Sequence, residues 1–180
     1  MTGRHREAAG KLEDLLQWVE PSADMFWSLG VTWLVAVEPA TALGYFEQGG
    51  TGANELGRVL ALHDLGRQEE FAAAFEAIKA DSQWSPESIA RIAAWTGQND
   101  LAFEYLEHMV DESGPAAAAG VDSDLYEPIK SDPRWPLFLE RNGVIEEDLS
   151  HIQFNPLLPP EVVEEVKRVR AERERNNDES

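Results

Sequence analysis

The sequence predicts an all-α protein, built as an antiparallel helix-hairpin solenoid of about three hairpins followed by C-terminal capping helices. Apolar residues recur at steps of three and four, which is the stripe of an amphipathic helix, whereas the alternation typical of strands is almost absent. Short breaks containing glycine or proline divide these stripes into helices of about 12 residues, as expected for antiparallel helices joined by tight turns.

The composition narrows the classes of function. The chain has 180 residues, enough for one domain with a substantial core, and 43% of them are hydrophobic. It has no cysteine, which excludes disulfides, thiolate metal sites and cysteine nucleophiles. Its formal net charge of −19 predicts repulsion from nucleic acid and from anionic membranes, so we expect neither of these as a partner.

The most apolar stretch, MFWSLGVTWLVAV, runs from Met25 to Val37 and is bounded by Asp24 and by Glu38-Pro39. Roughly 20 apolar residues are needed to cross a bilayer, so this stretch is too short for a membrane anchor. It also lies too far from Met1 for a signal peptide. We therefore expect a soluble, cytoplasmic protein in which this stretch is a buried helix.

The spacing within and after this stretch resembles the tetratricopeptide signature, W-x2-L-G-x2-Y followed by A-x3-F. The matching residues are Phe26, Leu29, Gly30 and Trp33, then Ala42 and Phe46. The resemblance implies that Met25 to Val37 is the first helix of a hairpin. The small Gly30 and Ala42 would let two helices approach closely, and the large Trp33 and Phe46 would fill the space beside them.

A similar hairpin is expected after Pro86, with Gly97 at its turn and Ala102-x3-Leu106 in its second helix. The segment between these two hairpins fits less well. The registers set by Leu56-Gly57 and by Gly66 differ by about two residues from the 34-residue period. In addition, Phe71 stands near a place where a small residue is expected. We predict a middle hairpin with a lengthened turn and leave its register open.

The first residues resemble the second half of a tetratricopeptide unit whose first helix is missing. Gly3, Ala8, Leu12 and Leu15 have the spacing of that half, and the next unit begins near Ala23. Because a repeat cannot bury its apolar face alone, we expect either that the chain is the C-terminal part of a longer protein or that another chain covers this helix. The alternative is an ordinary capping helix over residues 6–19.

The segment DSDLYEPIKSDPRWPLFLERNGV resembles the terminal element of many bacterial tetratricopeptide arrays, in which a short helix precedes an Asp-Pro-Arg-aromatic motif. Such arrays often follow a nucleotidyl cyclase, a protein kinase or a winged-helix regulator. Asp132 would cap the next helix and Gly143 would end it. The side chains expected to close the array are Trp135, Leu137, Phe138 and Leu139. Residues 1–145 would form the repeat domain, and 146–180 a short helix, an extended arm and a charged helical tail.

The motifs of the common enzyme classes are absent from the sequence. No two histidines have metal-ligand spacing, and Glu104 and His108, one helical turn apart, are more typical of a surface pair. There is no phosphate-binding loop of the Walker type and no nucleophile elbow. We therefore predict a non-enzyme with no catalytic, cofactor-binding or metal-binding residues.

The resemblance implies a groove that is lined by the first helix of each hairpin and binds a partner protein or an extended peptide. The candidate residues are Trp27, Val31, Arg58, His63, Trp84, Glu87, Arg91 and Trp95. Tryptophan and arginine are typical interface anchors, although Trp27 and Trp95 could equally be core residues. The expected function is a protein–protein interaction module, the C-terminal region of a larger bacterial signalling or transcription-regulatory protein. The alternatives are a self-assembly element that pairs through Leu12, Leu15 and Leu16 of the N-terminal helix, and a small-ligand sensor.

Overall fold

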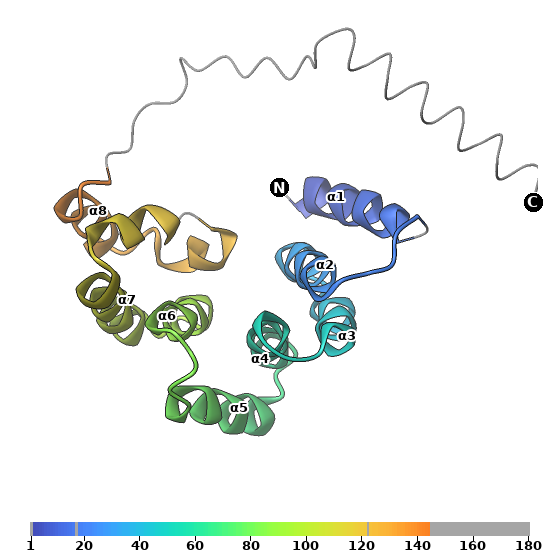
Figure 1. Ribbon diagram of the computed structural model, residues 1–180, viewed down its shortest axis with the longest axis horizontal. Helices are drawn as coiled ribbons and strands as arrows, with labels where there is room; N and C mark the ends of the chain where they lie inside the picture. The colour runs from blue at the N-terminus through green and yellow to red at the C-terminus, as the bar shows by residue number, and fades with distance from the viewer. Residues whose placement is uncertain (1, 17, 122, 145–180) are drawn as a thin grey trace, which may run out of the picture. The chain divides into compact units, whose positions relative to one another are not determined.

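A computed structural model describes residues 2–16, 18–121 and 123–144 of the chain. All of these belong to the first of the two units into which the chain divides, Met1–Ile145; the second is Glu146–Ser180. The short helix, extended arm and charged tail expected after residue 145 therefore lie outside the described residues. Within the described residues every regular element is helical (Figure 1), which confirms the predicted all-α class.

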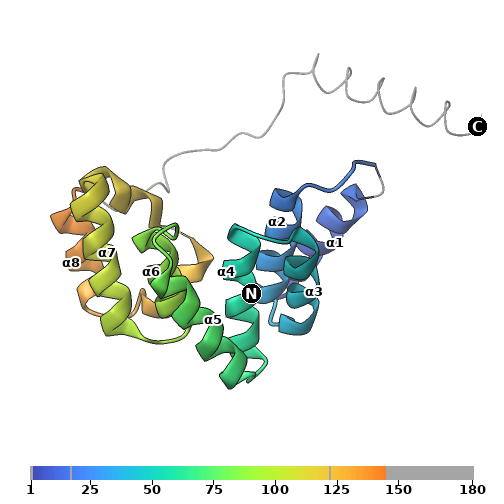
Figure 2. The same ribbon diagram turned by 60° about the horizontal axis from the view of Figure 1, so that its bottom comes forward.

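The helices follow one another as antiparallel pairs, and the predicted helix-hairpin architecture is confirmed: α2 packs on α3, α4 on α5, and α6 on α7 (Figure 2). The α-helices are α1 (Thr2–Leu15), α2 (Ala23–Val35), α3 (Pro39–Gly49), α4 (Ala53–Asp64), α5 (Gln68–Ala80), α6 (Pro86–Trp95), α7 (Asn99–Ser113) and α8 (Arg134–Arg141). Two 3₁₀ helices, η1 (Pro115–Val121) and η2 (Asp124–Ile129), connect α7 to α8.

The three hairpins turn through the same three-residue structure, at residues 36–38, 65–67 and 96–98. In each turn the N–H of the third residue donates to the carbonyl five residues earlier, over 2.9 to 3.0 Å, which is the closing bond of a Schellman motif. The middle residue has a positive φ. Its values are 64° at Val37, 70° at Gly66 and 73° at Gly97.

The middle hairpin therefore does not have a lengthened turn, and that prediction is wrong. Successive turns are separated by 29 residues (37 to 66) and by 31 residues (66 to 97), so the hairpins do not keep a 34-residue period. Counted from the turn, Phe71 occupies the position of Ala42 and Ala102. Because a phenyl ring replaces a methyl group at this point of close approach, α5 packs less closely on α4 than α3 does on α2.

Phe46 belongs to the first hydrophobic cluster, which joins residues of α2, α3, α4, α5 and α6 with Leu125 of η2. Its ring is fully buried and lies between Gly30 of α2 and Gly57 of α4. A Cβ atom placed on either glycine would come within 2.3 Å of the ring. The predicted close approach of helices at Gly30, with Phe46 filling the space, is therefore confirmed, and Gly57 extends the same contact to the next hairpin.

The first helix, α1, makes polar contacts with the first hairpin through Glu13 and through Arg6, which pairs with Glu38 in the turn between α2 and α3. Glu13 accepts hydrogen bonds from the Trp33 indole Nε1 (2.9 Å) and from the Tyr45 hydroxyl (2.7 Å). Burial, together with this bond to Glu13, raises the pKa of Tyr45 to about 12. Ala9, which belongs to α1, is fully buried. The helix thus packs on α2 and α3 by both apolar and polar contacts.

The second hydrophobic cluster closes the other end of this unit, between α6, α7, η1, η2 and α8. Trp135 and Phe138 are buried as predicted, but Leu137 is 63% exposed, so the prediction that it covers this end is wrong. Leu137 lies between those two positions on α8 and faces away from their buried side. Asp132 accepts a hydrogen bond from the Arg134 N–H (3.0 Å) at the start of α8, and Gly143, with φ 73°, follows its end.

Val37 is the one described non-glycine residue with positive φ, and its side chain is 69% exposed. A β-branched side chain is strained in this conformation, and here it has little packing to lose. We expect Val37→Gly to raise the free energy of unfolding by about 1 kcal/mol, measured by urea denaturation. Gly66→Val, the reverse change at the equivalent turn, should lower it. A loss of stability in Val37→Gly would contradict this account.

Candidate partner-binding face

The common turn defines equivalent positions in the first helices of the three hairpins. The positions ten, six and two residues before the middle turn residue form one stripe on each helix, because they are four residues apart. We call this stripe the first-helix face. Its residues are Trp27, Val31 and Val35 in α2, Leu56, Leu60 and Asp64 in α4, and Glu87, Arg91 and Trp95 in α6. Five of the eight predicted groove residues belong to it.

The α2 part of this face is half-buried. Trp27 packs against Phe46, with ring centroids 5.8 Å apart, and Val31 packs against the same cluster. In α4 the equivalent Leu56 and Leu60 are buried, so the face has no exposed apolar side chain there. The exposed parts of large side chains are therefore confined to α2 and α6.

Asp64 connects α4 to α6. The Trp95 indole Nε1 lies 3.1 Å from each carboxylate oxygen of Asp64, and the His63 Nδ1 lies 3.0 Å from one of them. The imidazole of His63 also meets the ring of Phe71 edge-on, with centroids 5.2 Å apart. The structure thus brings the predicted His63 and Trp95 together through Asp64, which is not one of the eight predicted groove residues. Asp64 and Trp95 each stand two residues before a turn glycine, Gly66 and Gly97, so they occupy equivalent positions in α4 and α6.

The α6 part of the face is partly covered by η2. The Tyr126 hydroxyl donates to the Glu87 carbonyl (3.5 Å), and the Arg91 guanidinium pairs with the Glu87 carboxylate. Burial raises the pKa of Tyr126 above its usual range. Arg91 and Glu87 keep about a third of their side-chain surface exposed, at 28% and 32%. Both residues therefore hold the α6–η2 packing in place and leave only a small part of their side chains accessible to a partner.

Three predicted groove residues lie outside this stripe: His63, which contacts Asp64 as described above, Arg58 and Trp84. Arg58 is on the α5 side of α4: the pKa of Glu70 in α5 is lowered first by its bond to Arg67 and also by the charge of Arg58. Trp84 precedes α6 and packs, half-buried, against the first hydrophobic cluster. The structure therefore does not bring Arg58 to the Asp64–Trp95 pair.

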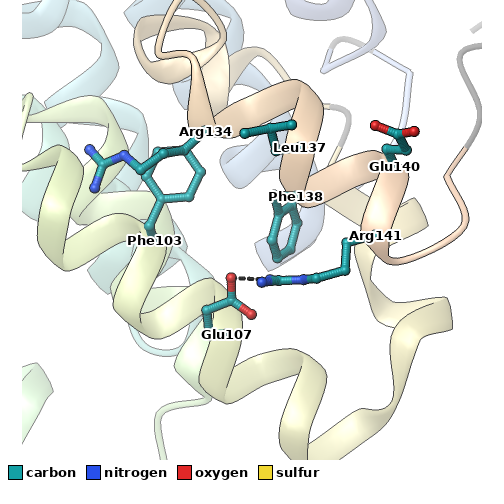
Figure 3. Close-up of a pocket in the computed structure, with 7 residues that line it drawn as sticks. All are labelled: Phe103, Glu107, Arg134, Leu137, Phe138, Glu140 and Arg141. Carbon is teal, nitrogen blue, oxygen red and sulfur yellow. Dashed lines mark hydrogen bonds and ion pairs between the residues drawn. The ribbon is translucent and has the colours of Figure 1, made fainter.

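Two surface cavities occur elsewhere in the described residues. The larger, of about 610 Å³, lies between α7 and α8. Figure 3 shows its two arginines already engaged: the Arg134 guanidinium lies 4.4 Å from the centroid of the Phe103 ring, and Arg141 pairs with Glu107. The second, of about 290 Å³, lies between α1 and α2.

The described residues contain no cluster of three or more histidine or carboxylate side chains that could hold a metal ion. Among those residues, none of the helices has the length and apolarity that crossing a bilayer requires. No protein-family model, curated protein or solved structure matches the chain.

Proposed function

We propose that this chain is a non-catalytic protein–protein interaction module of the tetratricopeptide type, which binds an extended segment of a partner protein along the first-helix face. The observation that carries the proposal is the Asp64–Trp95 pair, in which a half-exposed indole is held in place by a carboxylate of the neighbouring hairpin. An aromatic side chain fixed in this way presents contact area without losing rotamer freedom on binding.

The chemistry of the face suggests the kind of segment that it would bind. Trp27 and Val31 offer half-exposed apolar surface on α2, and Asp64 keeps 27% of its side-chain surface exposed beside Trp95. A carboxylate has about four acceptor positions, so Asp64 can accept a further hydrogen bond from a ligand. We therefore propose an extended peptide with one apolar side chain and one lysine or arginine.

The wider setting is part of the same proposal. The terminal element around Asp132 and α8 is similar in sequence to those of bacterial arrays that follow signalling or transcription-regulatory domains. We propose that this chain serves such a protein as a cytoplasmic interaction region. The short motifs of this terminal element support the assignment.

The proposal is tested by selecting peptides from a random display library on the full chain and measuring Kd by titration calorimetry. Trp95→Ala should weaken binding of a selected peptide at least tenfold, because it removes the anchored indole. Asp64→Asn should weaken peptides that contain lysine or arginine more than their uncharged variants, since it removes the charge that attracts them.

Leu137→Ala serves as the matched control, because Leu137 is an exposed apolar residue on α8, outside the face. It should leave the Kd unchanged. Melting temperatures of all variants are measured in parallel to separate binding from folding. The proposal fails if selection yields no peptide, or if Trp95→Ala leaves the Kd of the selected peptides unchanged.

A further inference from the structure

The groove between α1 and α2, here called the α1–α2 groove, has apolar walls and one carboxylate. It is lined by Leu12, Leu15, Val19, Met25 and Leu29, together with Asp24 and Ser28. Its volume of about 290 Å³ equals the liquid volume of roughly ten water molecules. The groove is thus large enough for a bicyclic ring and apolar enough to favour one.

Trp18 is adjacent to two residues that line this groove, because its backbone N–H donates to the Leu15 carbonyl (2.9 Å) and it precedes Val19 in the chain. Its side chain is 59% exposed, and no ring contact or hydrogen bond engages it within the part of the chain that the structure describes. Leu15 and Val19 are about half exposed, at 49% and 48%. These three account for most of the large apolar side chains that the described residues leave exposed. The exposed side chain of Trp18 and the apolar α1–α2 groove are therefore adjacent at the N-terminal end of this unit.

The polar rim of the groove also suits an indole. Asp24 has no side-chain hydrogen bond or ion pair with any described residue. Elsewhere in the molecule the chain pairs indole N–H groups with carboxylates: Trp33 with Glu13, and Trp95 with Asp64. A buried indole needs an acceptor for its N–H, and Asp24 supplies one beside apolar walls that include a methionine, a side chain that packs well on aromatic rings.

We propose that the α1–α2 groove is a self-association site, in which two copies of this chain pair about a two-fold axis and each places Trp18 in the groove of the other. A two-fold contact requires a surface that complements itself. Trp18 and the groove belong to one surface patch, so this patch can be self-complementary. A single two-fold rotation then places the Trp18 of each copy in the groove of the other. The Trp18 Nε1 of each copy would donate to Asp24 of the other.

This proposal is independent of the first-helix face, since it involves none of its residues. It would also cover the exposed side of α1. The first hairpin is already covered by α4, which packs on both α2 and α3. The occupant to be distinguished from a second copy is a helix of a different protein, which would bind the same groove while the chain itself remained monomeric.

The test is sedimentation velocity on the full chain from about 1 to 500 µM, a range that covers the affinities of weak homodimers. We expect a concentration-dependent dimer. Trp18→Ala should abolish it, and Trp18→Phe should weaken it about tenfold, because the ring remains but its hydrogen bond to a charged acceptor is lost. Asp24→Ala should weaken it by a similar factor.

The double variant Trp18→Phe/Asp24→Ala decides whether these two groups contact each other. If they do, the double variant should dimerise about as tightly as either single variant. If the two groups acted independently, the dimer affinity of the double variant would fall about a hundredfold. Leu137→Ala, which also removes an exposed leucine, should leave the dimer intact. A monomer at every concentration, a dimer that survives Trp18→Ala, or additive losses in the double variant would each overturn the proposal.

Discussion

Gly57→Ala is expected to lower the free energy of unfolding by about 3 kcal/mol, although the same change in an unhindered helix is stabilising. The added Cβ would lie 2.2 Å from the ring of Phe46. That ring has little room to move aside, since it has no exposed surface and a Cβ placed on Gly30 of α2 would also lie 2.3 Å from it. Either the ring must leave its rotamer or α4 must move away from α3, and both cost packing.

Gly44→Ala is the matched control, because Gly44 is on the same helix as Phe46 and nothing lies within 4 Å of the Cβ position. It should raise the free energy of unfolding by roughly 0.5–1 kcal/mol through helix propensity. Urea denaturation of both variants measures the difference. Phe46→Leu should partly rescue Gly57→Ala by making room. If Gly57→Ala matched Gly44→Ala in sign, the placement of Phe46 between α2 and α4 would be wrong.

Asn54→Asp is expected to cost about 3–5 kcal/mol at pH 7, the largest loss of any substitution considered for this chain. Asn54 is the one buried polar side chain of the described residues, with 2% of its surface exposed. Its Nδ2 donates to the carbonyls of Ala23 (3.1 Å) and Gly49 (3.4 Å), and so joins the start of α4 to α2 and α3. Aspartate has nearly the same shape but would bring a negative charge and no donor to these two oxygens.

The loss should diminish as the pH falls. Burial and the two facing carbonyls would raise the pKa of Asp at position 54 above its unfolded value, so the folded state binds a proton that the unfolded state releases. The stability of the variant relative to wild type therefore rises as the pH is lowered toward 4, where the protonated carboxyl can again donate. Denaturation curves at pH 7, 6, 5 and 4 measure this recovery.

Asn142→Asp is the control for this substitution, because Asn142 also donates to one carbonyl, that of Phe138 (2.8 Å), from a half-exposed position at the end of α8. Water can solvate the new charge there, so we expect a loss below about 1 kcal/mol with little pH dependence. Equal losses at the two positions would show that the side chain of Asn54 is not enclosed.

The buried faces of the helices could be predicted because helical periodicity is a local property. Phe71, Phe75 and Ile78 recur at the spacing of one helix face, and all three are buried. The pairing of Gly30 with Phe46 was also accessible, since it follows from small and large residues at motif spacing. Leu137 was misplaced because a run of apolar letters does not show which of them lies on the inner stripe of a short helix.

The register of the middle hairpin could not be obtained from a fixed 34-residue period, because the Schellman turn rather than the period places the helices. Gly66 and Gly97 are recognisable in the sequence as turn glycines. The first turn has Val37 at the equivalent position, so the sequence does not show that all three hairpins use the same turn. The contacts of Asp64 with Trp95 and of Tyr126 with Glu87 span 31 and 39 residues. Local sequence patterns do not predict contacts between residues so far apart in the chain, so this part of the candidate face could be found only from the structure.

The position of α6 has a consequence for how the molecule holds together. Ile89 and Ile92 belong to the first hydrophobic cluster, whereas Ala90, Ala93 and Ala94 belong to the second. In linear repeat proteins, cooperativity depends on the interfaces between neighbouring units. Because a single helix of ten residues contributes to both clusters, melting of either one removes a wall of the other. The two hydrophobic clusters of this all-helical unit are therefore energetically coupled through α6.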